Sequence, residues 1–291
     1  MKLASAPGTW GVEPPPRPTD PPWTRILDEI AAAGFDGSEL GPLGYYPLDA
    51  EELRAAFAQR GLALPAGFVM EPLAEADGAA LLDAARRTCA SVAGAGGSCI
   101  VLIDGLDWRR TTTAGRSSAA PRLDDVRWER LLASVEAIRA LAAEHGLALA
   151  FHPHAGTFVE FEDEVDRLMA EVDPSVGLCV DTGHAVYAGI DVVALIERYA
   201  HRIGHVHLKD LDVAVLDGEL RRGATFQDAV AAGVFTPLGD GSVDLRGAAA
   251  ALRAAGYDGW ATYEQDRTVA TIADALPDCR RSVAHARAAG F

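Results

Sequence analysis

The sequence predicts an α/β protein that folds as a closed (β/α)8 barrel. Eight short apolar runs alternate with longer amphipathic stretches, the arrangement that a parallel sheet with crossover helices requires. The chain has 291 residues, 49% of them hydrophobic, so it can form one barrel of roughly 250 residues plus insertions. We therefore expect a single barrel domain over residues 1–291.

The expected strands are short, and each precedes a helical pattern. They are Lys2–Ala6, Phe35–Leu40, Ala63–Val69, Cys99–Ile103, Leu147–His152, Gly177–Val180, Ile203–Leu208 and Gly259–Tyr263. Helix boundaries carry their usual signals, with prolines before the first helix and a glycine after several helices. These residues are Pro21-Pro22, Gly34, Gly61, Gly146 and Gly256.

An open, doubly wound sheet is the alternative architecture. Such a sheet normally has a glycine-rich nucleotide loop after its first strand. Residues Ala4–Gly11 read ASAPGTWG and lack the GxGxxG spacing. Eight repeats and the missing loop motif together favour a closed barrel.

Two long segments interrupt the repeat. Gly105–Leu123 follows the fourth strand, and Lys209–Gly241 follows the seventh and contains a short helical stretch near Phe226–Ala232. Barrel active sites lie at the carboxyl ends of the strands, where these segments begin. We expect them to cover a substrate pocket, although contacts in a homo-oligomer would also explain them.

Composition excludes several classes of function. The formal net charge of −16 argues against a nucleic-acid partner, because such binding depends on Lys and Arg neutralising phosphates. The four cysteines show no CxxC spacing, which favours a reducing, cytoplasmic location. No uncharged apolar stretch reaches about 18 residues, so no membrane partner is expected. A small-molecule substrate remains the expected partner.

Polar side chains follow five of the expected strands. Strand two ends in Glu39, strand five in His152 and His154, strand six in Asp181 with His184, strand seven in His205, His207 and Asp210, and strand eight in Glu264 and Asp266. A charge or imidazole at a buried strand end is costly unless it is paired or bound to a metal. The polar residues at the strand ends therefore predict a metal-binding or catalytic site at this end of the barrel.

Four of these residues are the predicted metal ligands: His152, Asp181, His207 and Glu264. In a closed barrel they would converge from neighbouring strands, and mixed imidazole and carboxylate ligands suit Mn or Co first, with Zn, Fe or Mg as alternatives. His205 precedes His207 on the same face and is expected deeper in the barrel. The sequence leaves open whether His152 or His154 is the strand-five ligand.

The motifs at these strand ends resemble those of the xylose isomerase-like barrel superfamily, and within it the inosose dehydratases (2-keto-myo-inositol dehydratases) of myo-inositol catabolism. The resemblance covers nearly the whole chain. The motifs are TWGV (9–12), ELGPLGYYP (39–47), GLALPAGFV (61–69), HPHAGT (152–157), VDTGH (180–184), HVHLKD (205–210), TFQDAVAAGVFTPLGDG (225–241) and YEQD (263–266).

The resemblance implies a metal site made by strands five to eight. The superfamily commonly uses Glu, Asp, His and Glu there, and this chain matches three of them with Asp181, His207 and Glu264. The fourth differs, because His152 stands where epimerases and isomerases have one of two catalytic glutamates. That departure favours elimination of water over epimerisation with two bases.

The predicted function is therefore that of a carbon–oxygen lyase that dehydrates an inosose or related keto-polyol through a metal-stabilised enediolate. An isomerase or epimerase with the same metal site is the main alternative; a non-catalytic polyol-binding barrel and metal-dependent cleavage of abasic DNA are weaker ones. Glu264 is the expected base, and His184 or His154 the expected acid. The expected substrate-binding residues are Glu39, Glu160, Lys209 and Trp10.

Overall fold

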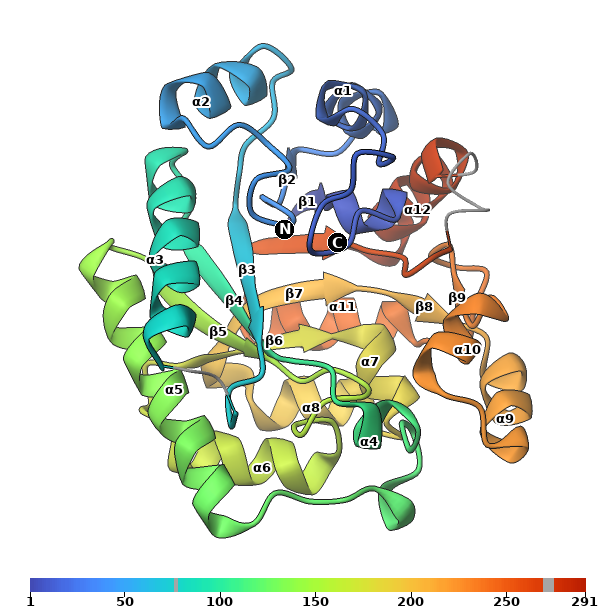
Figure 1. Ribbon diagram of the computed structural model, residues 1–291. Coiled ribbons are helices and arrows are strands. Elements are labelled where there is room, and N and C mark those ends of the chain that lie inside the picture. The colour runs from blue at the N-terminus through green and yellow to red at the C-terminus, as the bar shows by residue number, and fades with distance from the viewer. Residues whose placement is uncertain (76–77, 269–274) are drawn as a thin grey trace.

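The computed structural model describes residues 1–75, 78–268 and 275–291, and in them eight parallel strands curl into a barrel (Figure 1). The barrel strands are β1 (Lys2–Ser5), β2 (Gly37–Ser38), β3 (Ala66–Glu71), β4 (Cys99–Asp104), β5 (Ala148–His152), β6 (Gly177–Asp181), β7 (Ile203–Leu208) and β10 (Trp260–Tyr263). Their order is β2-β1-β10-β7-β6-β5-β4-β3. The predicted barrel fold is confirmed.

Backbone contacts close the barrel between β2 and the start of the third unit. Gly37 pairs with Ala63 in an isolated parallel bridge, and the Ser38 N–H donates to the Ala63 carbonyl over 3.0 Å. The regular strands here, β2 and β3, differ from the predicted ranges 35–40 and 63–69. A close approach explains the small residue at position 37, because a Cβ there would lie 2.6 Å from the Ala63 oxygen.

Helices surround the barrel (Figure 1). They are α1 (Trp23–Ala33), α2 (Ala50–Ala58), α3 (Gly78–Gly94), α5 (Asp125–Glu144), α6 (Glu162–Glu171), α7 (Thr182–Tyr187), α8 (Val192–Arg198), α11 (Leu245–Ala254) and α12 (Ala275–Ala289). The glycines predicted to follow helices all have positive φ angles, which a residue without Cβ adopts at low cost. No helix in the described part of the chain is long and apolar enough to span a membrane.

Both long segments contain structure of their own. The first holds α4 (Trp108–Thr111) and a 3-10 turn, Ser117–Ala119; the other 3-10 turns are Pro7–Trp10 and Ala200–Arg202. The second holds a hairpin of β8 (Asp210–Leu211) and β9 (Phe235–Thr236), the expected α10 (Phe226–Ala231) and the unpredicted α9 (Val213–Arg222). Buried Asp210 organises this segment by accepting hydrogen bonds from the N–H groups of Leu211, Gly239, Gly241 and Val243.

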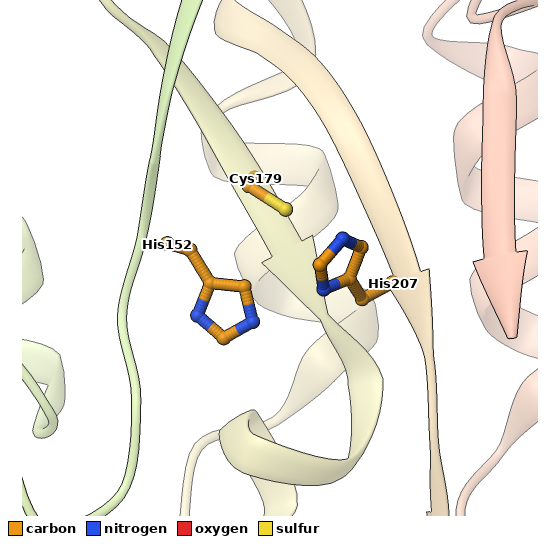
Figure 2. A group of neighbouring side chains, drawn as sticks. All are labelled: His152, Cys179 and His207. Atoms are coloured by element: carbon orange, nitrogen blue, oxygen red, sulfur yellow. The ribbon is translucent and has the colours of Figure 1, made fainter. Parts of the chain in front are cut away.

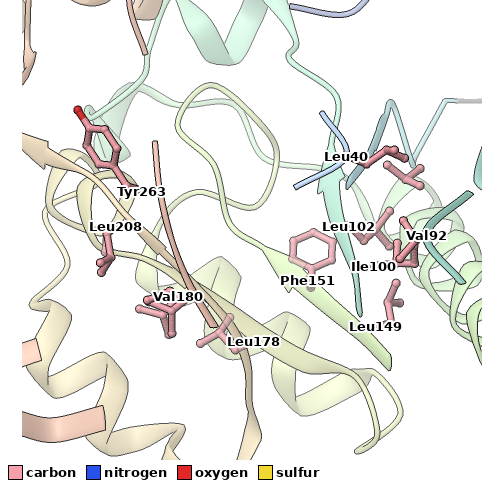
Figure 3. Packing of buried hydrophobic residues seen from close by; sticks show 14 of the residues in the cluster. Leu40, Val92, Ile100, Leu102, Leu149, Phe151, Leu178, Val180, Leu208 and Tyr263 are labelled. Atoms are coloured by element: carbon pink, nitrogen blue, oxygen red, sulfur yellow. The ribbon is translucent and has the colours of Figure 1, made fainter. Parts of the chain in front are cut away.

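Strand alternation separates two faces with different chemistry. His152, Cys179 and His207 point into the barrel, and the two imidazoles face each other across β6 (Figure 2). Leu102, Phe151, Leu178 and Val180 are among the residues that point outward and pack beneath the helices (Figure 3). Because side chains alternate between the faces with a period of two, the outward apolar residues fix the inward direction of the polar ones.

Candidate metal centre and active site

The pairing register of the strands places the polar side chains at the strand ends at the same height along the barrel axis. Ile103 pairs with His152 between β4 and β5, and Asp181 pairs with His207 between β6 and β7. Glu264 immediately follows β10, where its N–H donates to the Leu208 carbonyl over 3.1 Å. These side chains therefore meet at the carboxyl end of the barrel, where the sequence predicts a site.

Asp181, His207 and Glu264 offer ligand atoms that all lie within 4.8 Å of one another. His207 Nδ1 is 3.2 Å from Glu264 Oε2 and 3.9 Å from Asp181 Oδ2. This nitrogen is buried and has no hydrogen-bond partner among the described residues. Burial would lower the pKa of His207, but Glu264 and Glu39 raise it well above its usual value, so Nδ1 carries a proton when no cation is bound. A divalent metal bound by nitrogen and oxygen would replace that proton, so these three residues fit such an ion.

The two carboxylate oxygens of Asp181 have different roles: one caps a helix, and the other faces the candidate metal site. Oδ1 caps α7 by accepting the N–H groups of Gly183 and His184 at 2.9 and 2.8 Å. Oδ2 faces the barrel interior, 3.3 Å from His152 Nε2. The helix cap fixes the carboxylate and leaves one oxygen for a ligand.

His152 lies beside the three converging residues but belongs to other groups of neighbouring ligand atoms, with Asp181 and His184 or with Cys179 and His207. Its ring centroid is 5.0 Å from that of His207. Cys179 was not singled out from the sequence. Burial raises the pKa of its thiol well above the usual value, which keeps it protonated and makes it a poor metal ligand.

Glu39 lies below the ligands and contacts two imidazoles. Its Oε1 is 2.8 Å from His205 Nε2 and 3.0 Å from His207 Nε2. Burial alone would raise the pKa of Glu39, but His207 and His205 outweigh it and hold the carboxyl ionised. A carboxylate on Nε2 directs Nδ1 of His207 toward the ligand cluster. The structure thus places Glu39 behind His207, where it orients the ring, and not on the substrate side as expected from the sequence; His205 lies deeper in the barrel.

Lys209 extends into the ligand cluster. Its Nζ is 3.2 Å from Asp181 Oδ2, 3.0 Å from Glu264 Oε2 and 3.4 Å from Asp266 Oδ1. Burial would lower the pKa of Lys209, but the carboxylates, led by Asp181, raise it well above its usual value. The group therefore carries a fixed positive charge at the strand ends.

The same charge affects Glu264 and the nearby histidines. Burial would raise the pKa of Glu264, but His207 and Lys209 hold it at about 2.

His154 and His184 pack ring on ring, with centroids 3.7 Å apart. Burial lowers the pKa of both, that of His154 to about 3. Both imidazoles are therefore neutral near pH 7 and carry a lone pair.

An open cavity of about 550 Å³ lies above these groups, within the range of small-molecule sites. Its lining includes apolar and acidic side chains and one imidazole: Met70, Leu106, Phe226, Val230, Glu13, Asp266 and His154. The two long segments contribute Leu106, Phe226 and Val230, as expected of pocket covers. A larger hollow, of about 720 Å³, lies among α7, α8 and α9, away from the strand-end imidazoles.

Glu13 is a cavity residue that the sequence interpretation missed. Desolvation at the cavity wall and the acidic Asp266 raise the pKa of Glu13 to about 7, although the residue is open to solvent on its outer side. Glu13 also lines the smaller inner cavity together with His207, Lys209 and Glu264. The signal available in the sequence was the acidic residue directly after TWGV, which follows the first strand.

Two predicted substrate-binding residues lie outside this cavity. Trp10 is fully buried in the apolar core and donates from Nε1 to Glu29 on α1. Glu160 accepts hydrogen bonds from the N–H groups of Gly115 and Gly156 at 2.6 and 2.9 Å. Each already has its partners within the fold, so neither expectation of substrate contact is supported by the geometry.

A family model and full-length relatives of known name agree on the family to which this chain is similar. Residues 27–287 match the family model described as xylose isomerase-like TIM barrel. The rhizopine catabolism protein MocC of Rhizobium meliloti is 36% identical over 268 residues, which cover 92% of this chain and 82% of that protein. An inosose dehydratase of Geobacillus thermodenitrificans is 32% identical over 270 residues, covering 92% of this chain and 90% of the relative.

Solved structures share the fold at lower identity. The IOLI protein, solved with a bound zinc atom, superposes with a TM-score of 0.76 at 14% identity and covers 100% of this chain and 99% of its own. A 3-keto-D-glucoside 4-epimerase from E. coli gives a TM-score of 0.69 at 19% identity and covers 99% of both chains. At these identities the likeness concerns the barrel alone.

Proposed function

This chain belongs to the xylose isomerase-like TIM barrel family, and on that basis we propose that it is a metal-dependent lyase that dehydrates an inosose or a related keto-polyol. The observation that carries the proposal is the convergence of Asp181, His207 and Glu264 around the unpartnered His207 Nδ1, beside a cavity of suitable size. Similarity to inosose dehydratases over 92% of the chain supports the substrate class.

Asp181 Oδ2, His207 Nδ1 and a Glu264 oxygen would hold the metal, with Mn or Co first and Zn, Fe or Mg as alternatives. When bound, the metal supplies a positive charge that polarises the ketone and acidifies the neighbouring proton. Glu39 keeps the Nδ1 side of the His207 ring toward that position. The same metal site would serve an isomerase or epimerase, so the proton-transfer groups decide the reaction.

Elimination of water requires one proton to leave carbon and one to reach the departing hydroxyl. The sequence favours Glu264 as the base, but a carboxylate with a pKa of about 2 binds a proton weakly. Glu13 lines both the inner and the outer cavity, close to Glu264 and Asp266, and its pKa is raised, so it is placed to accept and return a proton. We therefore assign proton transfer to Glu13 and metal binding to Glu264.

The remaining cavity residues would orient the polyol. His154 is neutral, and its Nδ1 donates to the Ala155 carbonyl over 2.8 Å, which leaves Nε2 as an acceptor for a substrate hydroxyl. Phe226 and Met70 offer apolar surface for the ring face of the substrate. Lys209 fixes the positions of the Asp181 and Glu264 oxygens.

The test is to incubate the Mn²⁺-loaded enzyme with 2-keto-myo-inositol and follow the product by mass spectrometry and ultraviolet absorbance. We expect loss of one water and the appearance of a diketone chromophore. Exchange of the α-proton into deuterated solvent without dehydration would favour the isomerase or epimerase alternative. No turnover and no exchange with any keto-polyol would contradict the proposal.

A further inference from the structure

Two groups of metal-ligand side chains lie next to each other at the strand ends. The first comprises Asp181, His207 and Glu264, and the second comprises His154, His184 and Asp266. In each group the offered ligand atoms lie within 4.8 Å of one another. Judged by side-chain type and spacing alone, the barrel could therefore hold two metal ions side by side.

The ammonium of Lys209 contacts both groups. It is 3.2 Å from Asp181 Oδ2 and 3.0 Å from Glu264 Oε2 in the first group. It is also 3.1 Å from His184 Nε2 and 3.4 Å from Asp266 Oδ1 in the second. Both neighbours of the neutral His184 ring are donors: the Lys209 ammonium lies at Nε2, and the Ala155 N–H lies 3.4 Å from Nδ1. A neutral imidazole has one lone pair, so that lone pair is already used within the fold.

The backbone holds this amine in place. The Lys209 N–H donates to Thr182 Oγ1 over 3.0 Å, and that hydroxyl donates to the Lys209 carbonyl over 2.7 Å. Gly183 lies against the stem of the side chain, where a Cβ would collide with Lys209 Cβ. The side chain is 3% exposed, so solvent offers the amine little alternative.

The choice of residue type also indicates a specific role. Of 26 basic residues only two are lysines, Lys2 and Lys209, and the others are arginines. An ammonium is a compact point charge that can occupy the volume of a cation, whereas the guanidinium of arginine is a broad planar fork. The one buried lysine thus stands where a small positive charge fits.

We infer that the Lys209 ammonium fills the second cation position of this barrel, so that the chain binds one divalent metal and not two. Charge supports this assignment, because one divalent ion and one ammonium together balance the three carboxylates of Asp181, Glu264 and Asp266. A second divalent ion beside Lys209 would exceed the charge of these three carboxylates by two. The inference rests on the metal of the proposed function.

The test counts metal ions per chain. Protein stripped with chelator is reloaded with Mn²⁺, freed of excess ion by gel filtration, and assayed by elemental analysis and titration calorimetry. Wild-type protein should bind one Mn²⁺. Lys209→Ala should bind two, the second held by His154, His184 and Asp266, while Lys2→Ala, which changes the other lysine, should still bind one.

A further pair of variants checks the location of the new site. In the Lys209→Ala background, His154→Ala should return the count from two to one. In the wild-type background, His154→Ala should leave one ion bound with unchanged affinity, a result that does not depend on whether Lys209→Ala folds.

The outcomes separate the inference from the proposed function. Wild-type protein that binds no Mn²⁺ would overturn the metal site of the proposed function. Wild-type protein that binds two ions, a folded Lys209→Ala protein that still binds one, or loss of the ion in His154→Ala would overturn the role of Lys209.

Discussion

Two buried charge clusters near the carboxyl end of the barrel are held in different ways. The loop cluster consists of Arg110, Glu160 and Glu164. Arg110 donates from both terminal nitrogens to Glu164 at 2.7 and 2.9 Å. Glu164 Oε2 also accepts the N–H groups of Glu160 and Phe161. Backbone donors thus fix both carboxylates.

The strand-end cluster consists of Asp181, Glu264, Asp266 and Lys209. Asp181 Oδ1 caps a helix and accepts a backbone N–H. Each carboxylate of this cluster also has one oxygen paired with the Lys209 ammonium. The adjoining His207 Nδ1 has no hydrogen-bond partner in the described part of the chain. Charges held by the backbone serve the fold, whereas charges held only by one another can exchange their partners for a ligand.

The largest effect is expected from Asp181→Asn, which should reduce metal binding and activity to background. The unfolding free energy of the metal-free protein should change by less than about 1 kcal/mol, because Asn also caps helices and Lys209 keeps two carboxylate partners. Calorimetry and urea denaturation measure the two effects. Asp191→Asn, at the cap of α8, is the control, and an unfolded Asp181→Asn protein would make the strand-end cluster structural.

Glu13→Gln should lower turnover by about 10²–10⁴-fold, the usual contribution of a positioned acid or base. Metal binding should persist, since Glu13 is not among the converging ligands. Exchange of the α-proton into deuterated solvent distinguishes the candidate bases. If exchange survives in Glu13→Gln and disappears in Glu264→Gln with the metal still bound, the base is Glu264, as the sequence favours.

Arg110→Met should destabilise the fold by about 3 kcal/mol, because it leaves Glu160 buried without a cation and leaves Glu164 with only the partly exposed Arg122. The folded fraction should still bind metal, since the loop cluster shares no residue with the strand-end cluster. Urea unfolding measures the loss. Arg109→Met, which removes a partly exposed ion pair with Asp107, is the control and should cost much less than Arg110→Met, because solvent screens an exposed pair.

The smallest effect concerns pH. Burial raises the pKa of Glu160 from 4.5 to about 7, so the native state binds more protons than the unfolded state between these values. Its contribution to stability is therefore present below pH 4.5 and is lost as the pH rises through 7. In the Glu160→Gln variant, the fall in unfolding free energy between pH 5 and pH 8, measured by urea unfolding, should be smaller by about 2 kcal/mol. Equal slopes for this variant and the exposed control Glu162→Gln would contradict the assignment.

Much of the barrel and part of the site could be predicted from the sequence, because both depend on local patterns. Alternating side chains in Ala148–His152 and Gly177–Asp181 direct His152 and Asp181 inward without reference to distant residues. Glycines after helices mark turns by their own backbone freedom. The sequence therefore determined the barrel strands, the end at which the polar residues gather and the three side chains that converge there.

Only the tertiary structure decided what those side chains contact. Glu39 meets His207 across 168 residues of sequence, and Arg110 meets Glu164 across 54, so no local spacing predicts either pair. These contacts make Glu39 a support for a ligand and draw Glu160 into the fold. Electrostatics are equally non-local: His207 and Lys209 lower the pKa of Glu264, while desolvation at the cavity wall and Asp266 raise the pKa of Glu13. Protonation depends on the summed surroundings of a group, which exist only once the chain has folded.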